Sequence, residues 1–93
     1  KKDVHLVFTD EEKRVRGFSG CNQFTGTYEK KKNRLKFGPL AATMMACAEG
    51  MQQEQAFLKA LGKTVRYTVS GDHLMLYSKD EKLILRFKAA YQE

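Results

Sequence analysis

The stretch TVRYTVSGDHLMLYSKDEKLILRF, residues 64–87, shows the pattern that decides the fold. Apolar and polar residues alternate in three short runs, at Val65–Val69, Leu74–Leu76 and Leu83–Phe87. A period of two is typical of β-strands that bury one face. The runs are separated by a tight-turn sequence at 70–72 and a polar stretch at 78–81. Such closely spaced strands pair in antiparallel fashion, because parallel neighbours need longer crossover connections.

The same alternation fills the first part of the chain. It predicts four more strands, at Val4–Phe8, Val15–Phe18, Phe24–Tyr28 and Leu35–Phe37. Gly38-Pro39 then interrupts the pattern, and a further turn of helix is expected within 41–48. The apolar spacing changes to that of an amphipathic helix over about residues 50–61. Its apolar face carries Met51, Phe57, Leu58 and Leu61, and Gly62 is expected to end it.

The order of these elements predicts an α+β domain. Ninety-three residues allow one domain, which spans residues 1–93, and the 42% hydrophobic content is that of a globular protein. About seven strands must bury one face. We therefore expect a strongly curved antiparallel sheet or a partly open β-barrel, with the amphipathic helix inserted after the fourth strand.

The chain is basic, with 17 lysines and arginines against 11 acidic residues and a net charge of +6. The densest cluster consists of Lys30, Lys31, Lys32, Arg34 and Lys36. One interpretation is a polar hairpin turn between two strands. The other is an anion contact that binds nucleic acid or a lipid headgroup.

The residue pattern favours no catalytic site. His5 and His73 fall in phase with the solvent side of their strands, and no spacing places either beside Cys21 or Cys47. Neither a metal-ligand spacing nor a glycine-rich phosphate loop is present in the sequence. We expect no enzyme, no metal and no cofactor.

The two cysteines allow two interpretations. Cys21 follows a glycine at the end of a predicted strand, and Cys47 precedes the helix, so a helix that plugs a barrel would bring them together as a disulfide. Such a bridge suits an exported protein. The alternative is a pair of reduced thiols in the core of a cytosolic protein.

Several sequence blocks resemble the META domain family, which includes the HslJ-like heat-shock proteins. The first is Gly20-Cys21-Asn22-Gln23-Phe24-Thr25-Gly26-Thr27-Tyr28, and the second is Thr43-Met44-Met45-Ala46-Cys47. Leu35–Leu40, Glu54–Leu58 and Tyr67–Leu76 follow the family in order and spacing. The motif residues are Gly20, Cys21, Asn22, Phe24, Gly26, Thr43, Met44 and Cys47. The resemblance covers about residues 4–88.

The resemblance implies a small domain of bacterial cell-envelope lipoproteins or secreted proteins, located in the periplasm or at the outer membrane and linked to stress response. The family has no assigned catalytic residues, and its fold is similar to the cracked barrel of type III secretion pilotins. We therefore expect a non-enzymatic domain that binds a lipid or protein partner, with Met44, Met45 and Met51 as candidate contacts. The alternative for the methionine-rich stretch 43–47 is that it fills gaps in the core, which its composition favours. The alternative function is that of a cytosolic nucleic-acid-binding module that uses the basic hairpin Lys30–Lys36.

The chain departs from the family at its beginning. Family members usually open with a strand that carries a W-x-L pattern, whereas this sequence has no tryptophan and begins at the second strand. The missing strand would leave an unpaired sheet edge, which predicts a homodimer formed by strand pairing. A membrane contact is expected only through a lipid anchor outside this chain.

Overall fold

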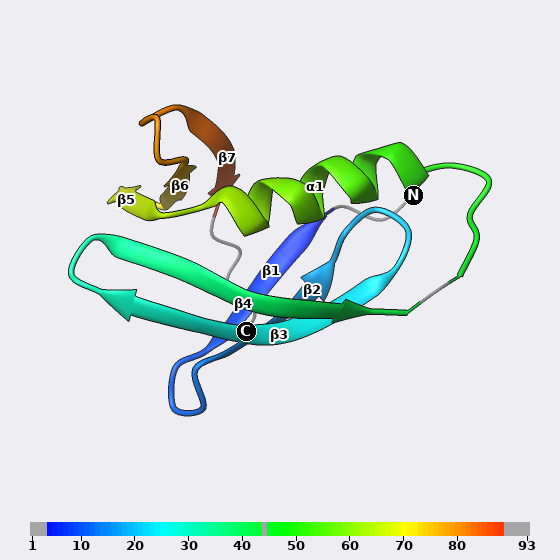
Figure 1. Ribbon diagram of the computed structural model, residues 1–93, viewed down its shortest axis with the longest axis horizontal. Helices are drawn as coiled ribbons and strands as arrows, with labels where there is room; N and C mark the ends of the chain where they lie inside the picture. Colours follow the sequence, from blue (N-terminus) through cyan, green and yellow to red (C-terminus); the bar gives the residue numbers. More distant parts are fainter. Residues whose placement is uncertain (1–3, 44, 89–93) are drawn as a thin grey trace.

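The computed structural model describes residues 4–43 and 45–88, which form seven strands and one helix (Figure 1). The strands are β1 (His5–Thr9), β2 (Arg14–Phe18), β3 (Gln23–Lys31), β4 (Arg34–Ala42), β5 (Arg66–Ser70), β6 (His73–Tyr77) and β7 (Leu83–Lys88), and the helix α1 (Met51–Lys63) follows β4. The predicted order of four strands, a helix and three strands is confirmed.

All seven strands belong to one sheet, in the order β1-β2-β3-β4-β5-β6-β7, and all neighbours are antiparallel. The pairing between β4 and β5 is much shorter than the others. Its register contains the single pair Arg34 and Arg66. Two backbone hydrogen bonds flank this pair: Leu35 N–H donates to Val65 at 3.1 Å, and Tyr67 N–H donates to Asn33 at 3.0 Å. This seam divides the sheet into two groups of strands.

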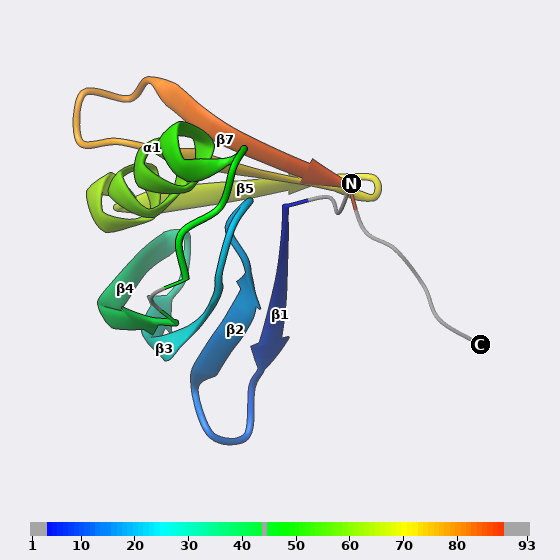
Figure 2. The same cartoon turned by 90° about the vertical axis from the view of Figure 1, so that its right-hand side faces the viewer.

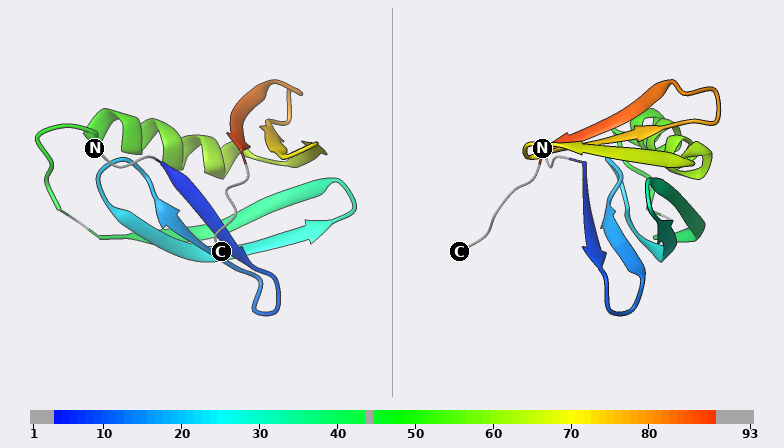
Figure 3. Two further views of the ribbon diagram at one scale, coloured as in Figure 1. Left: turned by 180° about the vertical axis from the view of Figure 1, so that it is seen from behind. Right: turned by 90° about the vertical axis from the view of Figure 1, so that its left-hand side faces the viewer.

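The two groups lie at a large angle to each other (Figure 2). The helix α1 lies over one face of β1–β4, and β5–β7 lie near its C-terminal end (Figures 1 and 3). The strands β1 and β7 end the sheet and do not pair with each other in the described part of the chain. The expectation of a strongly curved sheet or partly open barrel is met only in part, because the sheet is curled but not closed.

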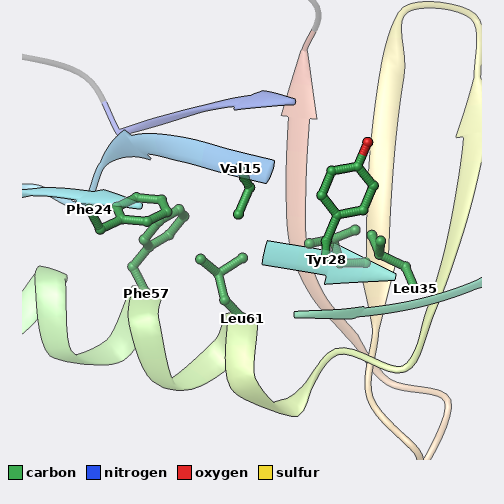
Figure 4. Packing of buried hydrophobic residues seen from close by; sticks show 7 residues of the cluster. Val15, Phe24, Tyr28, Leu35, Phe57 and Leu61 are labelled. Atoms are coloured by element: carbon green, nitrogen blue, oxygen red, sulfur yellow. The ribbon is translucent and has the colours of Figure 1, made fainter. Parts of the chain in front are cut away.

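The core lies between α1 and the sheet (Figure 4). Phe57 and Leu61 from the helix pack with residues of four strands, and the ring centroids of Phe24 and Phe57 are 5.7 Å apart. The strand residues of this cluster are Val15, Phe24, Tyr28, Leu35 and Leu76. They occupy the apolar phase that the alternation predicts, so the period-two pattern correctly identifies the buried face.

Two predictions around Pro39 are wrong. The strand β4 continues through Gly38 and Pro39 to Ala42, where the sequence suggested a break. Because β5 pairs with β4 only at Arg34, the Pro39 segment forms a sheet edge on that side, and an edge tolerates a residue without an N–H. Ala41 and Ala42 belong to this strand, and residues 45–50 are irregular, so the described part of 41–48 contains no extra helical turn.

The end of the helix also differs from the prediction. Gly62 lies inside α1, and the C-cap is Thr64 in an extended conformation. The Thr64 N–H donates to Leu61 at 3.2 Å, and its hydroxyl donates to the Ala60 carbonyl at 3.1 Å. These bonds satisfy carbonyls at the end of the helix without a left-handed glycine.

The alternation fails at two positions of the C-terminal strands. Val69 and Leu83, predicted to face the core, are 64% and 52% exposed. Val69 lies beside the turn between β5 and β6. At Leu83 the register between β6 and β7 shifts next to Leu76, which pairs Leu83 with Tyr77. A β-bulge of this kind changes the face on which later side chains lie.

Candidate functional site

Asn22, in the turn between β2 and β3, ties the irregular segment before the helix to the sheet. Its side-chain oxygen accepts hydrogen bonds from the Thr43 hydroxyl at 2.8 Å and from Met45 N–H at 2.9 Å. Its amide nitrogen donates to the Met45 carbonyl at 3.1 Å. The side chain thus pairs with both backbone groups of Met45 as a neighbouring strand would. With only 2% of its surface exposed, Asn22 makes these bonds out of water, where they are hard to replace.

Glu54, in the first turn of α1, completes this buried polar network. Its carboxylate accepts bonds from Ser19 Oγ at 2.6 Å, from the Asn22 backbone N–H at 2.7 Å and from Asn22 Nδ2 at 3.1 Å. The Ser19 bond is the largest cause that lowers the pKa of Glu54, and the Asn22 bonds add to it. We call Ser19, Asn22, Thr43 and Glu54 the polar clamp. It joins the β2–β3 turn to the helix and favours a charged Glu54.

A disulfide between Cys21 and Cys47 lies beside the polar clamp. The two Cα atoms are 5.9 Å apart, and the bridge spans 26 residues of sequence. Of the two interpretations that the sequence left open, the structure shows the disulfide. Gly20 and Gly50 lie so close here that a Cβ on Gly50 would meet the Gly20 carbonyl oxygen. Both glycines have positive φ angles, 113° and 92°, which other residues rarely adopt.

Two of the three candidate methionines lie around this bridge. The sulfur of Met51 is 3.7 Å from Cys21 Sγ, and the Met45 carbonyl oxygen is 3.4 Å from the same atom. Met45 is 61% exposed and Met51 39% exposed, although Met51 was expected on the apolar face of the helix. Met44 lies outside the described residues. We call Met45 and Met51 the methionine surface.

An open hollow of about 750 Å³ adjoins this surface at the start of α1. It is lined by Gly20, Met51, Gln53 and their neighbours in the segment 48–53. The volume lies in the range of small-molecule sites. Met51 belongs both to the methionine surface and to the wall of the hollow, so the two form one continuous region.

The basic cluster does not form one surface. Lys31 faces Arg34 across β3 and β4, and Lys36 faces Glu29, on the side of the sheet away from the core. By contrast, Lys30 Nζ lies 5.7 Å from the centre of the Tyr67 ring. Lys32 forms the turn with a φ of 56°, and its carbonyl accepts a bond from Tyr67 Oη at 2.8 Å. The hairpin turn predicted here is confirmed.

Neither cysteine is a free thiol that could pair with a histidine. His73 pairs with Asp72, with 3.2 Å between Nδ1 and Oδ1, and both cysteines are consumed by the disulfide. Among the described residues, no three histidine, cysteine or acidic side chains are grouped closely enough to hold a metal ion. The described helix is also too short and polar to cross a membrane.

Sequence reasoning missed half of the polar clamp. Asn22 and Thr43 were motif residues, but the roles of Ser19 and Glu54 were not foreseen. The available signal was an acidic residue in the first turn of a predicted helix, where backbone N–H groups favour negative charge. Nothing in the sequence showed that its partners would come from a turn more than 30 residues away.

Comparison with solved structures supports the fold. An NMR structure of a protein from Burkholderia xenovorans is 30% identical, with a TM-score of 0.78; the match covers 95% of this chain and 65% of that one. A crystal structure of a DUF4847 family protein from Bacteroides vulgatus is 15% identical, with a TM-score of 0.75 and coverages of 97% and 61%. This chain therefore spans less than two thirds of either protein.

No curated protein gives a significant match to the sequence. The META domain family, however, matches residues 1–91, almost the whole chain. The match includes the Gly20–Tyr28 and Thr43–Cys47 blocks, whose residues form the disulfide and much of the polar clamp. The chain belongs to the META domain family.

Proposed function

We propose that this META domain is a non-enzymatic module of the bacterial cell envelope that binds a lipid or protein partner through the methionine surface. The observation that carries the proposal is the exposure of Met45 and Met51 beside a disulfide. Exposed methionines are adaptable apolar contacts, since the unbranched thioether side chain fits many shapes.

The segment that holds Met45 is fixed before any partner arrives. Its backbone is bound on both sides by Asn22, and Cys47 anchors the same segment to Cys21 two residues later. A surface that is ordered in advance loses less conformational entropy on binding. The exposed side chain of Met45 on this cross-linked segment is therefore better suited to binding a partner than to filling the core.

The disulfide supports a location outside the cytoplasm, because such bridges persist in oxidising compartments. A lipoprotein or secreted protein of the periplasm or outer membrane, acting in stress response, is the setting we propose. Intact mass before and after reduction, on protein taken from the cell, tests this location. A gain of two hydrogens on reduction supports it, and rapid alkylation of both cysteines without reductant contradicts it.

The binding proposal is tested with lysophospholipids in native mass spectrometry. We expect complexes with the wild-type protein and their loss in the double variant Met45→Ser/Met51→Ser. The matched control is Val69→Ser/Leu83→Ser, which removes two apolar side chains, 64% and 52% exposed, from β5 and β7. Equal losses in both double variants, or no complex at high ligand excess, would contradict a lipid site here.

A second proposal concerns self-association. The strand β1 ends the sheet, and we propose that it pairs with β1 of a second copy to form a homodimer. Light scattering at high protein concentration should then give twice the monomer mass. A monomer at all concentrations overturns this proposal without affecting the methionine surface.

The alternative of a nucleic-acid-binding module has weaker support. It relied on Lys30–Lys36 acting together, but Lys30 lies over Tyr67 and Lys32 forms the turn. One face of the β3–β4 hairpin carries three of these cations, Lys31, Arg34 and Lys36. Retention on a polyanion column that falls steeply with salt, and that Lys31→Glu abolishes, would favour this alternative over the first proposal.

A further inference from the structure

The face of β1–β4 that points away from α1 carries its own ordered set of side chains. The strand registers align Val7, Arg16, Thr25 and Ala41 in one row across the four strands. Their neighbours in sequence, among them Val15 and Phe24, are buried on the opposite face. This row belongs to neither the methionine surface nor the polar clamp.

A second row lies beside the first. It contains His5, Phe18 and Gln23, which pair in turn across β1, β2 and β3, and Thr43, whose N–H donates to the Gln23 carbonyl at 3.0 Å. Between the two rows is an open hollow of about 390 Å³ with mostly apolar walls. The short side chain of Ala41 lies in its wall, and the volume of the hollow lies within the range of ligand sites.

Arg16 lies at the edge of this hollow, and no described acidic side chain neutralises its positive charge. Its side chain is exposed, and no described carboxylate lies within ion-pair distance of it. On the other side of its row lie Thr9, Arg14 and Thr27, so the three rows contain two arginines, one histidine and no acidic residue. Arg14 does not line the hollow, and its guanidinium lies 3.5 Å from Oγ1 of Thr25, which does.

We propose that this hollow binds an amphiphilic carboxylate. The carboxylate pairs with the Arg16 guanidinium, and the apolar part of the ligand lies over Ala41 between the rows. Arginine is suited to this role because its planar donors match the two oxygens of a carboxylate. The polar side chains of Gln23 and Thr43 border the hollow and offer further hydrogen bonds.

The charge pattern favours a small amphiphile over a polyanion. The remaining outward cations, Lys31, Arg34 and Lys36, lie toward the other end of the β3–β4 hairpin, with Glu29 among them. An extended polyanion would need both groups, whereas a single carboxylate needs only Arg16. The inference goes beyond the proposed function, since it uses a different surface and a different ligand class.

The test compares probes of equal chain length and different charge. Octanoate, octanol and octylammonium are titrated into the ¹⁵N-labelled protein, with acetate as the probe that lacks a chain. We expect octanoate to bind most tightly and octylammonium least, with amide shifts centred on Arg16, Thr25 and Ala41. Equal binding of octanoate and octylammonium would overturn the proposal, and so would shifts centred elsewhere.

Variants then separate the head of the ligand from its tail. Arg16→Gln should weaken octanoate about tenfold and leave octanol unchanged, because a charge-assisted pair is lost. Arg14→Gln is the matched control and should change neither affinity more than about twofold. Ala41→Leu fills the hollow and should weaken both probes. An equal effect of the two arginine variants would show a diffuse charge effect and contradict the site.

Two further measurements keep the proposals apart. Met45→Ser/Met51→Ser should retain octanoate binding; its loss would place the ligand at the methionine surface and overturn this inference. A single-stranded oligonucleotide that displaces octanoate and depends on Lys31, Arg34 and Lys36 would assign the face to polyanions, against the proposal. Circular dichroism confirms that each variant is folded.

Discussion

The two groups of strands in this sheet are held together by different means. The group β1–β4 is joined to α1 by the disulfide and the polar clamp, which link residues far apart in sequence. The group β5–β7 consists of two successive hairpins with local polar contacts, such as Arg66 over the Tyr77 ring at 4.1 Å. Tyr67 also bonds to the Lys32 carbonyl in the β3–β4 turn. The strand register between the groups contains one pair, Arg34 and Arg66, while Leu76 joins the common core.

This difference predicts that stability is unevenly distributed. Groups of elements that share few contacts can open separately, with their own free energies. The cross-linked group should resist opening because its unfolded chain is already constrained by the bridge. The hairpin group depends on the packing of a few apolar side chains, above all Leu76, which has no exposed surface. Changes in one group should therefore leave local hydrogen exchange in the other less affected.

The largest expected effect is the loss of the disulfide. In Cys21→Ser/Cys47→Ser, the free energy of unfolding should fall by about 3.5 kcal/mol, the chain-entropy value for a loop of 26 residues. Denaturant titration measures the total loss. Hydrogen exchange should accelerate most at the start of α1 and least in β6. Equal acceleration in both places would show that the groups open as one unit.

The next prediction, Leu76→Ala, destabilises the hairpin group β5–β7 more than the cross-linked group. Removing this buried side chain from β6 should destabilise the domain by about 3 kcal/mol, because it leaves a cavity in the core. Exchange should rise first in β5–β7, as measured by NMR. Val69→Ala, on the neighbouring strand but 64% exposed, is the control and should change stability by less than about 0.5 kcal/mol.

The stability that the polar clamp gives to the cross-linked group depends on pH through Glu54. Its pKa is lowered in the folded protein from the ordinary 4.5, so its contribution is present above that value and is lost as the pH falls below it. Glu54→Gln should cost about 2 kcal/mol at neutral pH, since the amide would point a donor at Ser19 or Asn22. Thermal unfolding between pH 6 and 3 (roughly the range of carboxylate titration) should show a smaller change in the variant than in the wild type.

The control for that experiment is Glu49→Gln, which alters an exposed carboxylate just before the helix. It should retain the acid sensitivity of the wild type. If it behaves like Glu54→Gln, the sensitivity arises from general charge and not from the polar clamp.

The smallest effect concerns Tyr28, whose hydroxyl donates to Asp10 in the β1–β2 turn. Burial and the bond to Asp10 raise the pKa of Tyr28 to about 12 from 10.0. A raised pKa means that the contribution is complete below pH 10 and is lost between pH 10 and 12. Tyr28→Phe should cost about 1 kcal/mol at neutral pH. Unfolding curves in alkali should converge with those of the wild type; parallel curves would contradict the assignment.

The alternation in the sequence was enough to predict the seven strands, their order and most of the core. It succeeded for Phe24 and Tyr28 because burial of one face repeats every second residue. It failed at Leu83, where a β-bulge changes the face of the sheet on which the side chain lies. It also failed at Pro39, which a strand tolerates here because no described strand pairs with that side of β4 there. Bulges and edges follow from pairing between strands, which a pattern along one chain does not contain.

The candidate site was predicted less completely. The disulfide and the exposed methionines were among the alternatives, and one of two interpretations of the basic cluster required its residues to bind an anion together. The structure divides that cluster because adjacent residues of a strand point to opposite faces, which places Lys30 and Lys31 on different sides. Arg16 drew no attention in the sequence, since its isolation beside Ala41 depends on the register of three strands.

The strand order has a consequence for the way the chain acquires its shape. Each strand pairs with the next strand in the sequence, so most of the sheet can form from contacts between near neighbours. Folding from such contacts is fast, because short loops lose little entropy on closing. The pairing of Cys21 with Cys47 needs both the β2–β3 turn and the beginning of α1 in place. We therefore expect the cysteines to be oxidised late in folding, after neighbouring strands have paired. The disulfide then stabilises an arrangement of hairpins that has already formed.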